Sequence, residues 1–102
     1  MSTIRHVVLW TMKDEAEGNT RRQNILLVKK KLEALRGRIP GLVDLHVFLN
    51  ENAQEKSGDL MLETVHESWE ALASYQTHPL HEEVASFIGK VRQNRMCVDL
   101  RS

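Results

Sequence analysis

The sequence predicts an α+β fold, in which helices cover one face of a four-stranded antiparallel sheet. Two observations predict it. Short segments with alternating or continuous apolar residues are typical of strands, and longer segments with apolar residues three and four positions apart are typical of helices. These segments follow one another in the order β-α-β-β-α-β, the ferredoxin-like split βαβ arrangement. A chain of 102 residues accommodates one such domain, over residues 1–102, and is too short for two.

The first predicted strand, residues 4–12, is apolar on both faces, which is typical of a strand in the middle of a sheet that is covered on both sides. Residues 13–19 are polar and contain a glycine, so we expect a loop after this strand. Side chains alternate between the two faces of a strand. One face of this strand therefore carries His6, Val8, Trp10 and Met12.

A helix and a second strand follow. Residues 20–38 have apolar residues at helical spacing with lysines and arginines between them, and Pro40 ends the helical pattern. Residues 42–49 alternate between apolar and polar side chains, which predicts a strand with one solvated or interfacial face. Its predicted apolar face consists of Val43, Leu45, Val47 and Leu49.

The second half of the chain provides the remaining two strands. Residues 50–57 are polar and predict a loop, and residues 59–66 predict the third strand. Residues 95–100 form a final short strand, and its apolar side chains on one face are Met96, Val98 and Leu100.

The segment from Tyr75 to His81 interrupts the second helical region. Pro79 lacks an N–H and biases the residue before it away from helical dihedral angles, so one helix, 69–76, ends before it. A second helix begins with Pro79 in its first turn, where the missing donor costs nothing. This places His78 at the N-cap and His81 in the first turn.

Composition excludes several classes of protein. The chain is 41% apolar, and its 14 basic and 14 acidic residues cancel, which argues against a nucleic-acid-binding or membrane-surface protein. No apolar stretch approaches the about 20 residues of a membrane span, and the N-terminus has no signal-peptide pattern, so we expect a cytoplasmic protein. The single Cys97 lies in an apolar run and is predicted to be a small buried residue rather than a nucleophile.

The predicted sheet has a second face that the helices do not cover. Several apolar side chains of the strands lie on it, and exposing them in a monomer would be unfavourable. We therefore expect a homodimer whose two sheets pack face to face into a barrel.

Several segments match one known family over nearly the full length. They are the residues Ile-Arg-His-Val-Val-Leu at 4–9, Ile-Pro-Gly-Leu at 39–42, the strand and turn at 59–68, Tyr75-x-x-His-Pro-x-His81 and Cys97-Val-Asp99. On these residues the chain resembles the stress-responsive dimeric α/β-barrel (Dabb) domain, a relative of the antibiotic-biosynthesis monooxygenase-type barrels. The resemblance implies a dimeric barrel and does not imply one particular reaction.

One class of the family, the plant polyketide cyclase olivetolic acid cyclase, has a Tyr and a His at positions that match Tyr75 and His81, and a pocket histidine that matches His6. In that enzyme the histidine is the general base of an intramolecular aldol condensation. The present chain departs from its pattern at two further pocket positions, a tyrosine and a histidine, which correspond to about Leu32 and Leu60.

The candidate catalytic residues are therefore His81, Tyr75 and His6. The positive end of the helix dipole favours the neutral imidazole that a base requires at position 81, and a tyrosine hydroxyl can polarise a carbonyl group. A structural interpretation stays open, in which His78 caps the helix, His81 packs over Pro79 and Tyr75 fills the edge of the core. The other two histidines, His46 and His66, are expected at the surface or at an interface.

A metal site requires three or more converging ligands. His78, His81 and Glu82 are close in sequence, but Pro79 disrupts their arrangement on one helix face, so we expect neither a metal nor another cofactor. Three functions follow. The chain is a homodimeric binding protein of unassigned activity with a pocket for a small hydrophobic carbonyl compound, or a cofactor-independent cyclase or lyase with His81 as base, or a cofactor-free oxygenase.

Overall fold

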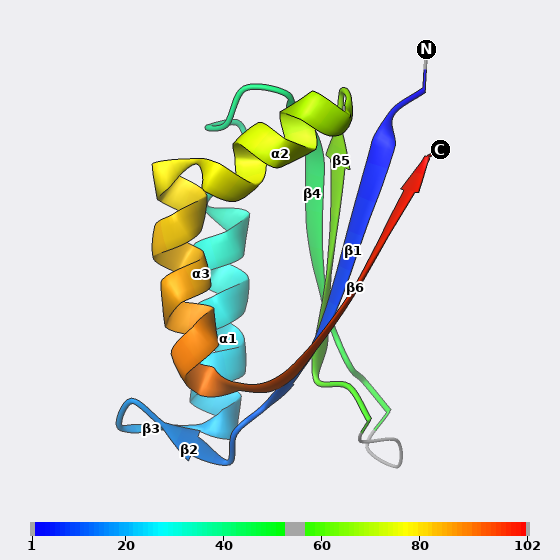
Figure 1. Ribbon diagram of the computed structural model, residues 1–102. Helices are drawn as coiled ribbons and strands as arrows, with labels where there is room; N and C mark the ends of the chain where they lie inside the picture. The colour runs from blue at the N-terminus through cyan, green and yellow to red at the C-terminus, as the bar shows by residue number, and fades with distance from the viewer. Residues whose placement is uncertain (1, 53–56, 102) are drawn as a thin grey trace.

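The structure is a computed structural model that describes residues 2–52 and 57–101. Four long strands form one antiparallel sheet in the order β4-β5-β1-β6, and a two-stranded hairpin precedes the first helix (Figure 1). The elements are β1 (Ile4–Met12), β2 (Glu15–Ala16), β3 (Asn19–Thr20), α1 (Arg21–Glu33), β4 (Leu42–Leu49), β5 (Leu60–His66), α2 (Trp69–Thr77), α3 (Pro79–Val91) and β6 (Arg92–Arg101).

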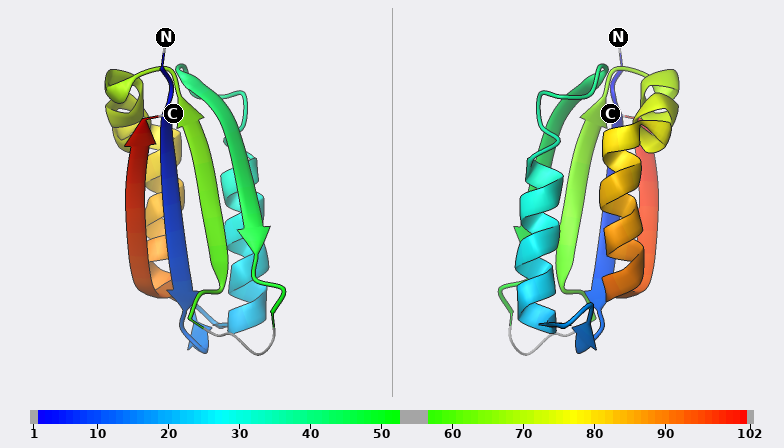
Figure 2. Two further views of the ribbon diagram at one scale, coloured as in Figure 1. Left: turned by 90° about the vertical axis from the view of Figure 1, so that its right-hand side faces the viewer. Right: turned by 90° about the vertical axis from the view of Figure 1, so that its left-hand side faces the viewer.

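All three helices lie on one face of the sheet, as the sequence predicts. Helices α1 and α3 run side by side along the sheet, and α2 lies across one end of the layer (Figures 1 and 2). The opposite face carries no helix (Figure 2). The α+β, ferredoxin-like prediction is confirmed, including the central position of β1 between β5 and β6.

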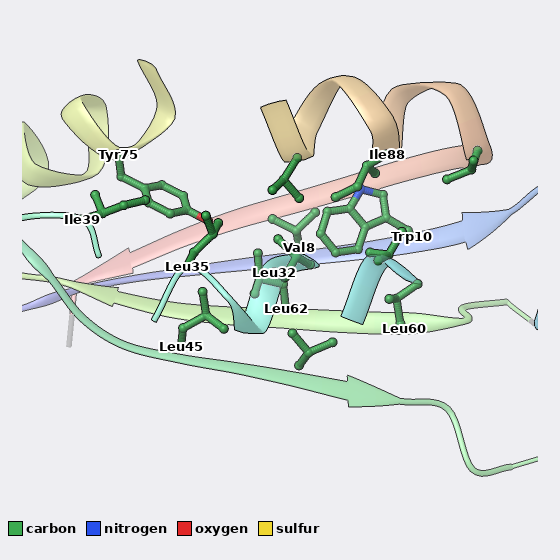
Figure 3. Packing of buried hydrophobic residues seen from close by; sticks show 14 of the residues in the cluster. Val8, Trp10, Leu32, Leu35, Ile39, Leu45, Leu60, Leu62, Tyr75 and Ile88 are labelled. Carbon is green, nitrogen blue, oxygen red and sulfur yellow. The ribbon is translucent and has the colours of Figure 1, made fainter. Parts of the chain in front are cut away.

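The core lies between the sheet and the helices (Figure 3). Alternate residues of β1 and β5 point into it, because side chains alternate along a strand, and the apolar stripes of α1 and α3 close it from the other side. Its members on these elements include Ile4, Val8, Trp10, Met12, Val28, Leu32, Leu60, Leu62, Val84, Ile88 and Val91.

The first helix is shorter than predicted. It begins after a capping box, in which Thr20 accepts a hydrogen bond from the Gln23 N–H and the Gln23 side chain accepts one from the Thr20 N–H. It ends at Glu33 instead of residue 38. The reason is Gly37, whose φ of 77° lies in the left-handed region, and residues 35–38 form tighter turns before it.

The predicted loop at residues 13–19 contains the short hairpin of β2 and β3. Its two turn residues, Glu17 and Gly18, have φ of 52° and 76°. Positive φ at both central residues is the geometry of a type I′ turn, which matches the twist of a hairpin. The sequence of this segment contains a single glycine as a turn signal, and this predicted a loop rather than a hairpin.

Strand β4 has the predicted bounds, but Val43 does not share the face of Leu45 and Val47. A register shift between Leu42 and Asp44 places Val43 on the surface, with 56% of it exposed. The last strand is longer than predicted because β6 begins at Arg92, immediately after α3. The predicted polar loop at 50–57 lies in part outside the described residues.

Large apolar side chains remain exposed on the sheet face that the helices leave open. They come from the central strand β1 and from both edge strands, and they include Leu9, Phe48, Met96, Val98 and Leu100. Among the described residues, no helix is both long and apolar enough to cross a membrane.

Candidate functional site

The break between α2 and α3 is organised by His78. Its backbone is extended, and its Nδ1 accepts a hydrogen bond of 3.1 Å from the backbone N–H of Leu80. Pro79 is the first residue of α3. His78 is thus the N-cap that the sequence predicts, and it satisfies one of the backbone donors that every helix start leaves unpaired.

His81 connects the two helices across this break. Its Nδ1 lies 3.1 Å from the backbone oxygen of Gln76 in α2. A carbonyl oxygen only accepts, so Nδ1 carries the proton and Nε2 of the neutral ring keeps its lone pair. Burial lowers the pKa of His81 below 6.5, which favours the neutral imidazole at neutral pH.

His6 forms a second oriented imidazole on the sheet. It lies opposite Asp99 in the antiparallel pair of β1 and β6, and its Nδ1 is 2.5 Å from Oδ1 of Asp99. The His6 side chain is almost fully buried. Since the carboxylate accepts a hydrogen bond from Nδ1, Nε2 is the ring nitrogen that remains available.

A pocket of about 210 Å³ joins the two histidines. It lies between β1, β5 and β6 on one side and α1 and α3 on the other. Its volume is below the roughly 300–1,000 Å³ of sites for drug-sized ligands, so it suits a small metabolite. The residues that line it are His6, Val8, Trp10, Leu32, Leu62, His81, Ala85, Ile88, Gly89, Arg92 and Arg95.

Tyr75 does not line this pocket. It is fully buried in the core (Figure 3). Its ring packs against those of His81 and His66 at centroid distances of 4.5 and 4.8 Å. Its hydroxyl has no hydrogen-bond partner among the described residues. Burial raises the pKa of Tyr75, so the hydroxyl stays protonated and is an uncommitted donor.

His66 is buried, which corrects the expectation of a surface or interface position. It shares the helix-facing side of β5 with Leu60, Leu62 and Thr64, and its Nε2 lies 2.8 Å from the Thr64 hydroxyl. Burial, with a smaller contribution from the nearby His6, lowers its pKa to about 4. His66 is therefore a neutral core histidine next to Tyr75.

Cys97 is exposed on the edge strand β6, which corrects the expectation of a buried residue. It lies beside the pair of His6 and Asp99, with its sulfur 3.6 Å from Nδ1 and 3.8 Å from Oδ1. Partial burial and the Asp99 charge raise the pKa of its thiol. A protonated thiol is a poor nucleophile, so this position does not favour nucleophilic catalysis.

The metal-type donors that converge in the described ranges are those of His6, Cys97 and Asp99, all within 4.8 Å of one another. These are the residues that could hold a metal, rather than the set around His78 considered from the sequence. Nitrogen and oxygen ligands of one tetrahedral zinc ion lie about 3.3 Å apart, given bond lengths near 2.0 Å. Nδ1 of His6 and Oδ1 of Asp99 are in direct contact at 2.5 Å, closer together than two ligands of one zinc ion would lie.

Sequence reasoning placed His6, Tyr75 and His81 in one pocket, and of these the structure places His6 and His81 in the pocket wall and Tyr75 outside it. It did not assign a role to Asp99, which was noted only as part of a family segment. The signal was weak, because the two partners are 93 residues apart and meet only through the register of β1 and β6. Of the two positions that depart from the cyclase pattern, Leu32 lines the pocket and Leu60 does not.

Comparisons with known proteins agree with this fold. Residues 4–102 match the Stress responsive A/B Barrel Domain family. A dimeric protein of unknown function with a ferredoxin-like fold from Bacteroides fragilis is 25% identical, with a TM-score of 0.82 over 98% of this chain and 96% of that one. The Arabidopsis thaliana protein At3g17210 is 26% identical, with a TM-score of 0.76 over 97% and 94%.

A hydroxynitrile lyase from Passiflora edulis shares the fold, with a TM-score of 0.81 over 98% of this chain and 93% of that one, at 12% identity. A search of the curated proteins gave no match. The family match extends over almost every residue and agrees with the sheet order and helix placement described above. The chain belongs to the stress responsive A/B barrel domain family.

Proposed function

We propose that this protein is a cofactor-independent enzyme that moves a proton on a small carbonyl compound, as a lyase, cyclase or isomerase does, with His81 as the general base. One observation carries the proposal: His6 and His81 line the same pocket, and each has its Nδ1 bound to an acceptor, so that Nε2 is the available nitrogen. A base must present a lone pair to the proton that it removes.

His6 and Tyr75 have supporting roles in this proposal. His6, held by Asp99, assists in its doubly protonated form, in which Nδ1–H donates to Asp99 and Nε2–H donates to the carbonyl oxygen. Tyr75 does not line the pocket, and its ring packs against His81, so it positions the base; a role as polariser of the carbonyl group requires the substrate to reach its buried, uncommitted hydroxyl. The Passiflora edulis lyase shows that this fold accommodates a lyase.

The test is the exchange of α-protons for deuterium on 4-oxopentanoate and its methyl ester in D₂O, followed by proton NMR. The wild-type protein should accelerate exchange beyond the rate in buffer. His81→Asn is the matched variant, because the asparagine amide can still donate to Gln76 while the base is lost. Equal exchange with the wild type and with this variant, or no acceleration by the wild type, would contradict the proposal.

A non-catalytic role is the second candidate function. The bond from His81 to Gln76 and the cap formed by His78 both stabilise the helix break, and this is sufficient reason for these residues in a binding protein. The variant separates the two roles. His81→Asn that retains the melting temperature and loses exchange supports catalysis, and His81→Ala that loses only stability supports the structural role.

We further propose that the protein is a homodimer through the open face of the sheet. Two observations support this: the exposed apolar side chains on that face, and the description of the Bacteroides fragilis protein as dimeric. Apolar patches of this kind mark interfaces in soluble proteins. The pocket lies on the helix side of the sheet, so each protomer of such a dimer has its own pocket.

Light scattering tests the dimer. The wild type should have a mass about twice the 11.8 kDa of one chain. Val98→Asp, on the open sheet face, should produce monomers. Leu26→Asp, an equally polar change at an exposed residue of α1, should leave the dimer intact. A monomeric wild type, or equal effects of the two variants, would exclude this interface.

A further inference from the structure

The pocket contains a group of hydrogen-bond donors that the proposed proton transfer does not use. Arg92 and Arg95, at the start of β6, line it together with Trp10 of β1. Each guanidinium is always charged and has five N–H donors and no acceptor. The indole of Trp10 also only donates.

The charges of the two arginines are not balanced within the described part of the chain. Neither Arg92 nor Arg95 forms an ion pair there, and Asp99, an acidic residue of the same strand, is bound to His6. Burial is the main cause that lowers the pKa of His81, and the charge of Arg95 adds to it. Burial and Asp99 raise the pKa of the Cys97 thiol, and the nearby Arg95 opposes them. Its guanidinium is therefore on the histidine side of the pocket and unpaired with any acid.

Trp10 supplies the second, independent observation. Only 5% of this residue is exposed, and its Nε1 has no hydrogen-bond partner in residues 2–52 and 57–101. Figure 3 shows the indole directed from β1 toward α3, with its nitrogen beside Ile88, another residue of the pocket wall. Leaving a buried N–H unpaired costs about 1–3 kcal/mol, so an acceptor at this position stabilises the site.

We infer that the pocket takes a small compound that carries a carboxylate a few carbons away from its reactive carbonyl group, and that Arg92, Arg95 and the Trp10 N–H hold the carboxylate. Arginine pairs with carboxylates through two parallel hydrogen bonds, which fixes orientation as well as charge. When the carboxylate is bound there, the carbonyl end of the compound lies near His6 and His81. The inference replaces the hydrophobic carbonyl ligand expected from the sequence, and its carbonyl part rests on the proposed function.

The experiment compares binding of 4-oxopentanoate with that of its neutral methyl ester by NMR titration at low ionic strength. The acid should bind about tenfold or more tightly than the ester, because hydrogen bonds to a charged group are stronger than neutral ones. Arg92→Gln/Arg95→Gln should remove this preference and leave the ester unchanged. Arg101→Gln, at an exposed arginine of the same strand outside the pocket, is the matched control and should keep the preference.

A second variant locates the site without touching a charge. A side-chain carbon added at Gly89 meets no other atom within 4 Å, so Gly89→Leu is compatible with the fold and narrows the pocket. It should weaken binding of both acid and ester. Equal binding of acid and ester by the wild type, or loss of the preference in Arg101→Gln as well, would overturn the inference.

The outcomes separate this inference from the proposed function. Binding of the acid through the two arginines without any deuterium exchange supports the carboxylate site and refutes the enzyme. Exchange on the ester that equals exchange on the acid supports the enzyme and refutes the carboxylate site.

Discussion

Two histidine–aspartate pairs occur on opposite faces of the same sheet, and they differ in surroundings rather than in composition. His6 and Asp99 join β1 and β6 on the helix side, with only 3% of the histidine side chain exposed. His46 and Asp44 lie two residues apart on the edge strand β4, and about half of each side chain is exposed. His6 of the first pair lines a pocket, and the second pair faces the open side of the sheet.

The two pairs also hold the imidazole in opposite ways. Nδ1 of His6 faces its carboxylate, whereas His46 uses Nε2, 2.9 Å from Asp44. The hydrogen bond from His46 is the main cause that lowers the pKa of Asp44, followed by the backbone N–H of Leu45. A His–Asp contact alone is therefore no indication of a catalytic site; burial and a place in the pocket wall distinguish His6 from His46.

The largest difference should appear in catalysis. His6→Asn keeps a donor for Asp99, and His46→Gln keeps one for Asp44, so both variants preserve the pairing. We expect the deuterium exchange rate to fall by about 10²–10⁴ in His6→Asn, as is typical when a general acid or base is lost. The rate should not change in His46→Gln. Equal losses in the two variants would remove the distinction between the pairs.

The second difference concerns stability against pH. The pKa of buried His66 is about 4 in the folded protein and 6.5 in the unfolded chain, so the folded state binds fewer protons between these values. Stability should therefore fall by on the order of 3 kcal/mol as the pH drops from 6.5 to 4. The lowered pKa of His81 acts in the same direction.

Urea unfolding at fixed protein concentration measures this dependence, and His66→Phe should flatten it. The exposed pair of His46 and Asp44 affects stability in another pH range. The lowered pKa of Asp44 stabilises the fold above pH 3.8, and this contribution is lost as the pH falls through the folded pKa. An unchanged slope between pH 6.5 and 4 in His66→Phe would contradict the assignment to His66.

The smallest expected effect concerns the unpaired polar atoms of the buried region. Tyr75→Phe removes a buried hydroxyl without a partner, so the free energy of unfolding should rise by about 1 kcal/mol. Deuterium exchange should fall at the same time if the hydroxyl polarises the carbonyl group. Thermal unfolding and the exchange assay measure the two effects. A less stable variant with full activity would show that Tyr75 only packs.

Local patterns in the sequence were sufficient for most of the fold. The bounds of β1 and β4 agree with the predictions because alternation and β-branched residues define both strands. Pro79 fixed the break between α2 and α3 for a local reason, its missing N–H. Alternation along β5 also indicates that His66 is buried, because His66 shares a face with Leu62. We expected it at the surface or at an interface instead, because histidine is polar.

The site was harder to predict because its parts meet only through sheet register. Asp99 reaches His6, and Arg95 reaches Trp10, because β1 and β6 pair antiparallel in one particular register. A one-residue shift would turn either side chain to the other face of the sheet. The register shift near Val43 in β4 changes the face of a side chain in this way, and no local sequence pattern predicted it.

The most direct measurement is nitrogen NMR of the five histidine rings at pH 8, which reports which nitrogen carries the proton. The account predicts a proton on Nδ1 and a bare Nε2 for His81, a proton on Nδ1 for His6, and a proton on Nε2 for His46. A proton on Nε2 of His81 would mean that no lone pair faces the pocket, and this result would contradict the central claim.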